Sequence, residues 1–167
     1  MNIKIFIIFA VNLLFFNFYF KPVLALEHTQ KAGLFSMDVP KEWHWFEYPQ
    51  EIIITYPDGK TMAFDIQMIP SRKLSQAEIK KNLKEGKDKM IKEGIEAHNG
   101  NLIDDKEIKI DGVYATRLDF KTASPNTVYG TYISFFNKGY AFTVTYGSVN
   151  DKTHLGMDDA IATFKFK

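Results

Sequence analysis

The sequence contains no cysteine, and this absence removes several classes of protein at once. A chain without thiols has no disulfide, no thiolate metal site, no cysteine nucleophile and no cysteine that carries a lipid. Such a domain must be held together by its hydrophobic core. Most of the 15 phenylalanines and 8 tyrosines and both tryptophans lie after residue 25 and supply the material for that core.

An excess of charge of one sign is also missing, because 21 basic residues face 20 acidic ones and the net charge is +1. Balanced charge gives no long-range attraction to nucleic acid or to anionic lipid, so we expect no nucleic-acid partner. The chain also lacks the motifs G-x-S-x-G, S-x-x-K and H-E-x-x-H and a glycine-rich phosphate loop. We therefore expect a protein that is not an enzyme and uses no cofactor.

The first 25 residues have the three parts of a secretory signal peptide. Lys4 precedes an apolar stretch from Ile5 to Phe20, and Val23-Leu24-Ala25 offers the residues that signal peptidase reads. We predict cleavage after Ala25, which leaves a single exported domain of residues 26–167 in the periplasm or outside the cell, with no membrane contact. The alternative is an uncleaved anchor, because residues 3–20 approach the ~20 residues that cross a bilayer.

Alternating apolar residues predict a series of β-strands along the mature chain. They cover residues 33–39, 51–56, 61–69, 102–110, 113–121, 127–136 and 140–146. Turn residues predict hairpins at Pro57-Asp58-Gly59, Asp111-Gly112 and Asn137-Lys138-Gly139. In the strand of residues 61–69 we expect one face to carry Met62, Phe64, Ile66 and Met68.

One long helix is predicted from Leu74 to Gly94, and it begins with a capping box of Ser75 and Glu78. Its apolar stripe consists of Ile79, Leu83, Gly86 and Met90, and Gly94 is the expected stop. A shorter helix is predicted over residues 151–163, with Asp151 as its cap and Leu155, Ile161 and Ala162 facing inward. The result is an α+β fold, an antiparallel β-sheet with one long helix and a shorter C-terminal helix packed on it.

Three segments of the chain resemble the PsbP-like fold, which is shared with the Ran-binding Mog-type proteins and with exported bacterial domains of unknown function. Residues 35–43 resemble its opening strand, residues 137–146 its central hairpin, and residues 159–166 its closing segment. The resemblance implies the same α+β fold, but these motifs describe packing and turns rather than a catalytic site. Members include photosystem-associated proteins, bacterial lipoproteins and periplasmic proteins, and the missing lipobox cysteine departs from the lipoproteins.

The densest aromatic run lies at residues 43–48. Alternation along a strand predicts one side with Trp43, Trp45 and Glu47 and another with His44, Phe46 and Tyr48. We expect Trp43 to lie in the core. We interpret Trp45, Phe46 and Tyr48 as a surface for a partner or an apolar ligand.

No metal site is predicted. The four histidines, His28, His44, His98 and His154, are too dispersed for a zinc motif, and the pairs Asp104-Asp105 and Asp158-Asp159 lack the pattern of a calcium loop. We expect these carboxylates on a solvated turn and a helix face. The lysines of the long helix alternate with acidic residues in pairs such as Glu85–Lys89 and Asp88–Lys92, which is typical of a solvated charged face.

Together these patterns predict an exported, non-enzymatic binding or accessory protein of the cell envelope. We expect a monomer whose partner is an envelope protein or a small apolar ligand. The alternative is a periplasmic hydrolase with a dispersed polar active site, because catalytic triads are defined by geometry and not by sequence position.

Overall fold

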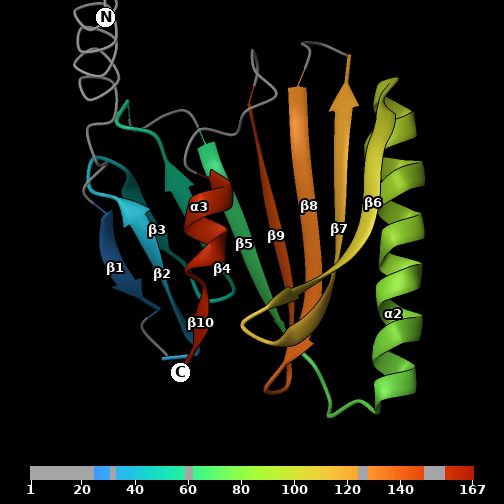
Figure 1. The fold of residues 1–167 in the computed structure, drawn as a ribbon, viewed down its shortest axis with the longest axis horizontal. Helices are drawn as coiled ribbons and strands as arrows, with labels where there is room; N and C mark the ends of the chain where they lie inside the picture. The colour runs from blue at the N-terminus through green and yellow to red at the C-terminus, as the bar shows by residue number, and fades with distance from the viewer. Residues whose placement is uncertain (1–24, 31–32, 59–61, 124–127, 149–156) are drawn as a thin grey trace, which may run out of the picture.

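The computed structural model describes residues 25–30, 33–58, 62–123, 128–148 and 157–167. These residues form two antiparallel sheets with helices packed on them, which confirms the predicted α+β fold (Figure 1). The large sheet has the order β3-β4-β5-β9-β8-β7-β6 and the small sheet the order β1-β2-β10. The large sheet consists of β3 (His44–Glu47), β4 (Glu51–Thr55), β5 (Met62–Pro70), β6 (Asn101–Ile110), β7 (Val113–Thr122), β8 (Val128–Asn137) and β9 (Tyr140–Ser148). The small sheet consists of β1 (Ala25–Thr29), β2 (Phe35–Pro40) and β10 (Lys165–Phe166).

The predicted hairpins are present in the large sheet. Asp111 and Gly112, with φ of 46° and 80°, connect β6 to β7, and Lys138 and Gly139, with φ of 47° and 80°, connect β8 to β9. Two successive positive φ values match the right-handed twist of the flanking strands. The antiparallel pairing of β4 with β5 confirms that these two strands form a hairpin, while Gly59 of the predicted turn lies outside the described residues.

The small sheet was not predicted as a separate unit. Strand β2, the predicted opening strand, pairs with β1 and β10 and with no strand of the large sheet. The alternation Phe35, Met37, Val39 specifies which face of β2 is buried, but it does not specify the neighbouring strands.

The main core lies between the two sheets and is rich in aromatic side chains. The ring of Phe35 from β2 stacks on Phe164 at 4.3 Å, and Phe135 of β8 stacks on Phe142 of β9 at 4.9 Å. Offset and edge contacts of this kind stabilise a core beyond the area that they bury. The helix α3 (Met157–Ala162) adds Met157, Ala160 and Ile161 to this core.

Strand β5 contains a β-bulge that overturns one prediction. Ile54 pairs with Phe64 while Thr55 pairs with Met62, so Ala63 is the extra residue. An extra residue reverses the alternation of the strand beyond it. Phe64, Ile66 and Met68 therefore face the main core as predicted, whereas Met62 points to the other side of the sheet and is 49% exposed.

The long helix begins as predicted and ends later than predicted. In α2 (Gln76–Lys89), the side chain of Ser75 accepts from the backbone N–H of Glu78, which confirms the capping box. The chain continues past Gly94 as the π-helical turn η1 (Met90–Ile95) and the 3₁₀ turn η2 (Glu96–His98), and the left-handed residue is Asn99. Gly94 instead leaves room for Met90, whose Sδ would lie 2.6 Å from a Cβ at that position.

The C-terminal helix partly matches its prediction. Ile161 is buried, but Ala162 is exposed and Ala160 takes the inward position. The predicted cap Asp151 and the inward Leu155 lie outside the described residues.

No helix among the described residues is both long and apolar enough to span a bilayer. The segment on which the export prediction rests, residues 1–24, lies outside that part of the chain. Ala25, the predicted last residue of the signal, is the exposed first residue of β1, opposite Pro40.

Candidate functional site

The aromatic run of residues 43–48 contains the edge strand β3 and divides its side chains between two environments. Phe46 is 43% exposed and Tyr48 is 51% exposed. Phe46 pairs with Ile53 of β4 across the sheet, and Ile53 in turn pairs with Asp65 of β5. Since partners in register share one side of a sheet, these three side chains form one row.

Trp45 points to the opposite side of β3, toward the small sheet. Its ring stacks on His28 of β1 at 5.1 Å and lies 6.2 Å from Phe35. Trp43 packs edge-on against Tyr56 at 4.8 Å and borders the main core. The structure therefore does not bring the three predicted surface residues together, because Trp45 is half-buried beneath the strand that exposes Phe46.

The side of β3, β4, β5 and β9 that faces away from the small sheet is exposed, and we call it the open face. On this side of the sheet the helix α2 contacts β7 and β8. Besides Phe46, the exposed apolar side chains on the open face are Met62 and Ile69, at 49% and 52%. Tyr48, two residues beyond Phe46, lies at the margin of the same side. Large exposed apolar side chains that gather on one surface can mark an interaction site.

A carboxylate stands in the middle of the open face. Asp65 Oδ2 accepts a hydrogen bond from Gln67 Nε2 at 3.0 Å, while Asp65 Oδ1 is buried and has no partner among the described residues. Burial is the main cause that raises the pKa of Asp65, against the hydrogen bond from Gln67 that lowers it. The hydroxyl of Thr55, on the same side of the sheet, is also buried without a partner in the described part of the chain. Unpaired buried acceptors favour a ligand or partner that brings hydrogen-bond donors.

A second polar cluster lies on the inner side of the large sheet, where α3 packs against it. Arg117 donates from Nε to Asp119 at 2.9 and 3.1 Å and from Nη1 to Asp158 of α3 at 2.8 Å. The hydroxyl of Tyr146 donates to Asp158 at 2.5 Å, and the hydroxyl of Thr131 donates to Asp119 at 2.7 Å. Burial, followed by the hydrogen bond to Asp158, raises the pKa of Tyr146. A cavity of about 450 Å³ opens beside this cluster.

Asp158 lies on an exposed helix face as predicted, with its side chain 54% exposed, but the sequence prediction missed its hydrogen bonds to Arg117 and Tyr146. Within this cluster the hydroxyl of Thr131 and the carboxylate of Asp119 form a pair of the kind that a hydrolase could use. Both carboxylate oxygens of Asp119 accept from Arg117, and one also accepts from Thr131. The cluster is arranged to fix α3 to the sheet.

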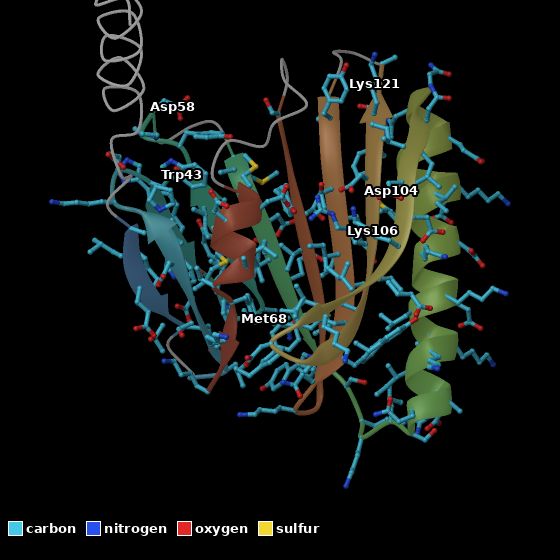
Figure 2. All side chains as sticks on the ribbon, viewed as in Figure 1. Trp43, Asp58, Met68, Asp104, Lys106 and Lys121 are labelled. Carbon is cyan, nitrogen blue, oxygen red and sulfur yellow. The ribbon has the colours of Figure 1, made fainter. Side chains whose placement is uncertain are left out.

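The other predicted polar residues lie in separate places. The pair Asp104-Asp105 lies on strand β6 and not on a turn, as Figure 2 shows for Asp104. Asp104 forms an ion pair with Lys106 at 2.8 Å, and Asp105 forms one with Lys87 at 2.7 Å. His28 and His44 lie beside aromatic rings, His98 ends η2, and His154 is outside the described residues. No group of potential metal ligands occurs within the described ranges. On the long helix the observed i,i+4 pairs are Lys81–Glu85 and Lys89–Glu93.

The fold of this protein matches several solved structures. No family model matches the chain, and no curated protein does. A cyanobacterial PsbP (CyanoP) from Synechocystis sp. PCC 6803 superposes with a TM-score of 0.59 at 12% identity over 87% of this chain and 94% of that one. The Ran-binding protein Mog1p of Saccharomyces cerevisiae gives 0.56 at 8% identity over 86% and 96%. The protein has the PsbP/Mog-type fold.

Two further structures share this PsbP/Mog-type fold. LpqN of Mycobacterium tuberculosis, which is involved in cell envelope biogenesis, gives a TM-score of 0.53 at 14% identity over 86% of this chain and 91% of LpqN. A protein of Bacteroides thetaiotaomicron gives 0.60 at 12% identity over 84% of this chain. The match spans only 48% of that longer protein. At such identities the likeness is one of fold, and function must be argued from this chain's own surface.

Proposed function

We propose that this protein is an exported, non-enzymatic accessory protein of the cell envelope that binds a partner protein through the open face. The contact is centred on Phe46 and Tyr48. Trp45 supports this contact from below, because its packing on His28 and Phe35 fixes the edge strand β3. The chain acts as a monomer in this proposal.

The observation that carries the proposal is the exposure of four large side chains, Phe46, Tyr48, Met62 and Ile69, along one side of the sheet. Aromatic residues and methionine are enriched where proteins bind each other. One side of a pleated sheet also suits a protein surface better than a small molecule, which prefers a concave site.

The polar groups of the open face add a requirement on the partner. Asp65 Oδ1 and Thr55 Oγ1 are buried acceptors without a described partner. Glu51 adds a second carboxylate near Asp65 and contributes to its raised pKa after burial. A partner with exposed apolar side chains beside a lysine, an arginine or free backbone N–H groups complements this surface.

The comparisons support an accessory role without specifying a partner. LpqN is described as involved in cell envelope biogenesis and Mog1p as Ran-binding, so proteins with this fold include one that binds a protein and one that serves the envelope. Export is inferred from the N-terminal segment of this chain.

The experiment is site-specific photo-crosslinking in the producing cells. p-Benzoyl-phenylalanine replaces Phe46 in one variant and Ile103 in the control, because Ile103 is 59% exposed on the opposite edge strand β6. We expect one discrete adduct with position 46 that position 103 does not give. The double change Phe46→Ser and Tyr48→Ser should remove the adduct formed by a crosslinker at Ile69, while the melting temperature stays within a few degrees.

An adduct pattern that is the same at positions 46 and 103 contradicts the proposal. So does an adduct at Ile69 that survives loss of both aromatic side chains. Sedimentation of the purified protein checks the monomer, and a stable dimer that buries Phe46 would assign the open face to self-association instead.

A further inference from the structure

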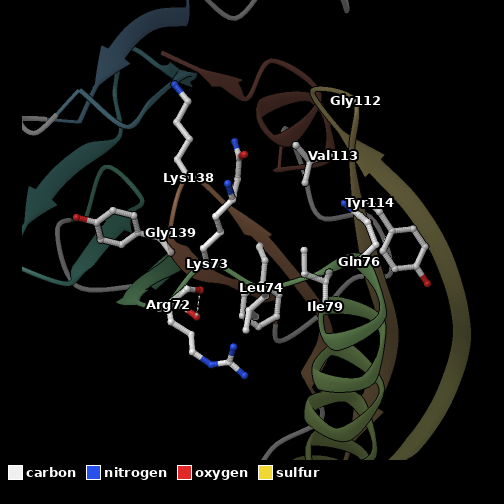
Figure 3. A pocket seen from close by; sticks show the side chains of 14 residues that line it. Arg72, Lys73, Leu74, Gln76, Ile79, Gly112, Val113, Tyr114, Lys138 and Gly139 are labelled. Atoms are coloured by element: carbon white, nitrogen blue, oxygen red, sulfur yellow. Dashed lines mark hydrogen bonds between the residues drawn. The ribbon is translucent and has the colours of Figure 1, made fainter.

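A cavity of about 650 Å³ opens at the end of the molecule where α2 begins (Figure 3). Three segments that are distant in sequence meet there: the β5–α2 loop of residues 71–74, the β6–β7 turn and the β8–β9 turn. The backbone N–H of Ser71 donates to the carbonyl of Gly139 at 2.7 Å, which fixes the loop to the turn. The volume falls within the range of about 300–1,000 Å³ that is typical of ligand sites.

All charged residues that line the cavity are basic. They are Arg72, Lys73 and Lys138, and the lining contains no aspartate or glutamate. Arg72 is neutralised by Glu78, at 2.5 Å. Lys73 and Lys138 make no ion pair with any described residue, and in Figure 3 both extend away from the direction that Arg72 takes. Both lysines are exposed and line the same cavity without a counter-charge from any described residue, so an anion bound there can interact with two cations.

The backbone at Lys138 supports a role for this side chain. Lys138 adopts a positive φ of 47°, a conformation that costs a non-glycine residue about 1 kcal/mol and that asparagine or glycine would adopt more readily. The turn therefore holds a lysine where another residue would form the turn better.

The rest of the lining is apolar. Leu74, Ile79, Val113 and Phe136 contribute side chains to the wall. Ile79 was predicted in the buried stripe of the long helix, yet it is only half-buried, because this cavity opens beside it. The cavity thus combines a cationic rim with an apolar wall.

We propose that this cavity binds a single-chain anionic amphiphile, an aliphatic carboxylate whose head group contacts Lys73 and Lys138 and whose chain packs on Leu74, Ile79 and Val113. This inference is independent of the partner surface, since no residue assigned to the open-face contact lines the cavity.

The test measures binding of dodecanoate by titration calorimetry below its micellar concentration. The full chain is expressed with its own N-terminal segment, and the form that the cells export is purified. The variant Lys73→Gln with Lys138→Gln should bind dodecanoate at least tenfold more weakly than the original protein. The matched control, Lys84→Gln with Lys92→Gln, changes two exposed lysines of α2 and η1 and should bind within twofold of it.

Two further ligands separate the parts of the proposal. Dodecan-1-ol should bind at least tenfold more weakly than dodecanoate and should not distinguish the variants. Acetate should fail to displace dodecanoate. If acetate competes equally, the site binds anions alone, and if dodecan-1-ol binds equally, the lysines play no part; either result overturns the proposal.

Methyl NMR of the unaltered protein keeps the test independent of the variants. Dodecanoate should shift the methyl signals of Leu74, Ile79 and Val113 and leave those of Leu102 and Ile103 on β6 in place. An absence of shifts at the cavity methyls, or of any binding, overturns the proposal. Loss of the crosslink at Phe46 does not bear on this result, so the two proposals fail separately.

Discussion

Truncation of one leucine tests how α2 is held to the sheet. Leu83 is the fully buried residue of α2, at 1% exposure. It lies in a small apolar layer with Ile95, Leu118 and Phe120, which are buried but do not belong to the core between the two sheets. With so few buried side chains in this layer, we expect Leu83 to contribute a large share of the stability of the helix.

The change Leu83→Ala removes three carbon atoms from that layer. At about 0.8 kcal/mol for each buried CH₂ group the transfer term is about 2.4 kcal/mol. The cavity that remains raises the expected loss to about 3 kcal/mol, within the range of about 2–5 kcal/mol for such truncations. A loss of this size is a large part of the stability of about 5–15 kcal/mol of an ordinary domain.

Urea unfolding followed by circular dichroism measures this free energy. The control is Lys84→Ala, which changes the exposed neighbour of Leu83 on the same helix and should cost less than about 0.5 kcal/mol. Leu83→Asp should cost more than Leu83→Ala, because it also buries an unpaired charge. If Leu83→Ala and Lys84→Ala have the same unfolding free energy, α2 does not pack on the sheet through Leu83 and the assignment is refuted.

Three further predictions concern the N-terminus, the open face and the inner cluster. N-terminal sequencing of the exported protein should begin at Leu26, and a full-length chain retained in the membrane would establish the anchor alternative. Asp65→Asn should raise the melting temperature at pH 7. Burial raises the pKa of Asp65 in the folded protein above its ordinary value of 3.8, so at pH 7 the ionised carboxylate lowers the stability of the fold, and asparagine removes that charge. The gain should vanish near pH 3, where the unfolded chain is protonated too, and a loss of stability at pH 7 would contradict this reasoning. Tyr146→Phe removes the hydrogen bond to Asp158 and should cost about 1–2 kcal/mol, whereas Tyr48→Phe should be neutral; equal unfolding free energies would show that the bond does not fix α3.

The features that the sequence predicted well depend on neighbours along the chain. The capping box needs only Ser75 and Glu78, three residues apart, and the turn at Asp111-Gly112 needs only two residues with positive φ. The alternation that buries Phe142, Val144 and Tyr146 follows from the period of an extended strand. Each of these signals is complete within a few residues.

Predictions failed where the outcome depended on contacts between distant residues. The bulge at Ala63 reverses Met62 because of the pairing with Ile54 and Thr55, and no local pattern marks it. Gly94 is an exception, because its residue type suggested a helix stop whereas it makes room for Met90, which lies one helical turn earlier in the chain.

The candidate sites divide in the same way. The aromatic run at residues 43–48 was visible in the sequence, but its division between Trp45 beneath the strand and Phe46 above it depends on the small sheet that covers one side. The cluster of Arg117, Asp119 and Asp158 joins residues up to 41 positions apart, so its members gave no motif.

The sequence by itself determined the long helix, the strands β2 and β4 to β9 and the turns at Asp111-Gly112 and Asn137-Lys138-Gly139, because steric limits on the backbone and the periods of helix and strand act locally. Only the tertiary structure decided which strands form the second sheet, which half of the large sheet stays open, and which three loops enclose the cavity beside Lys73 and Lys138. These depend on pairing and packing between segments far apart in the chain, and the choice among compatible pairings is made by the core as a whole.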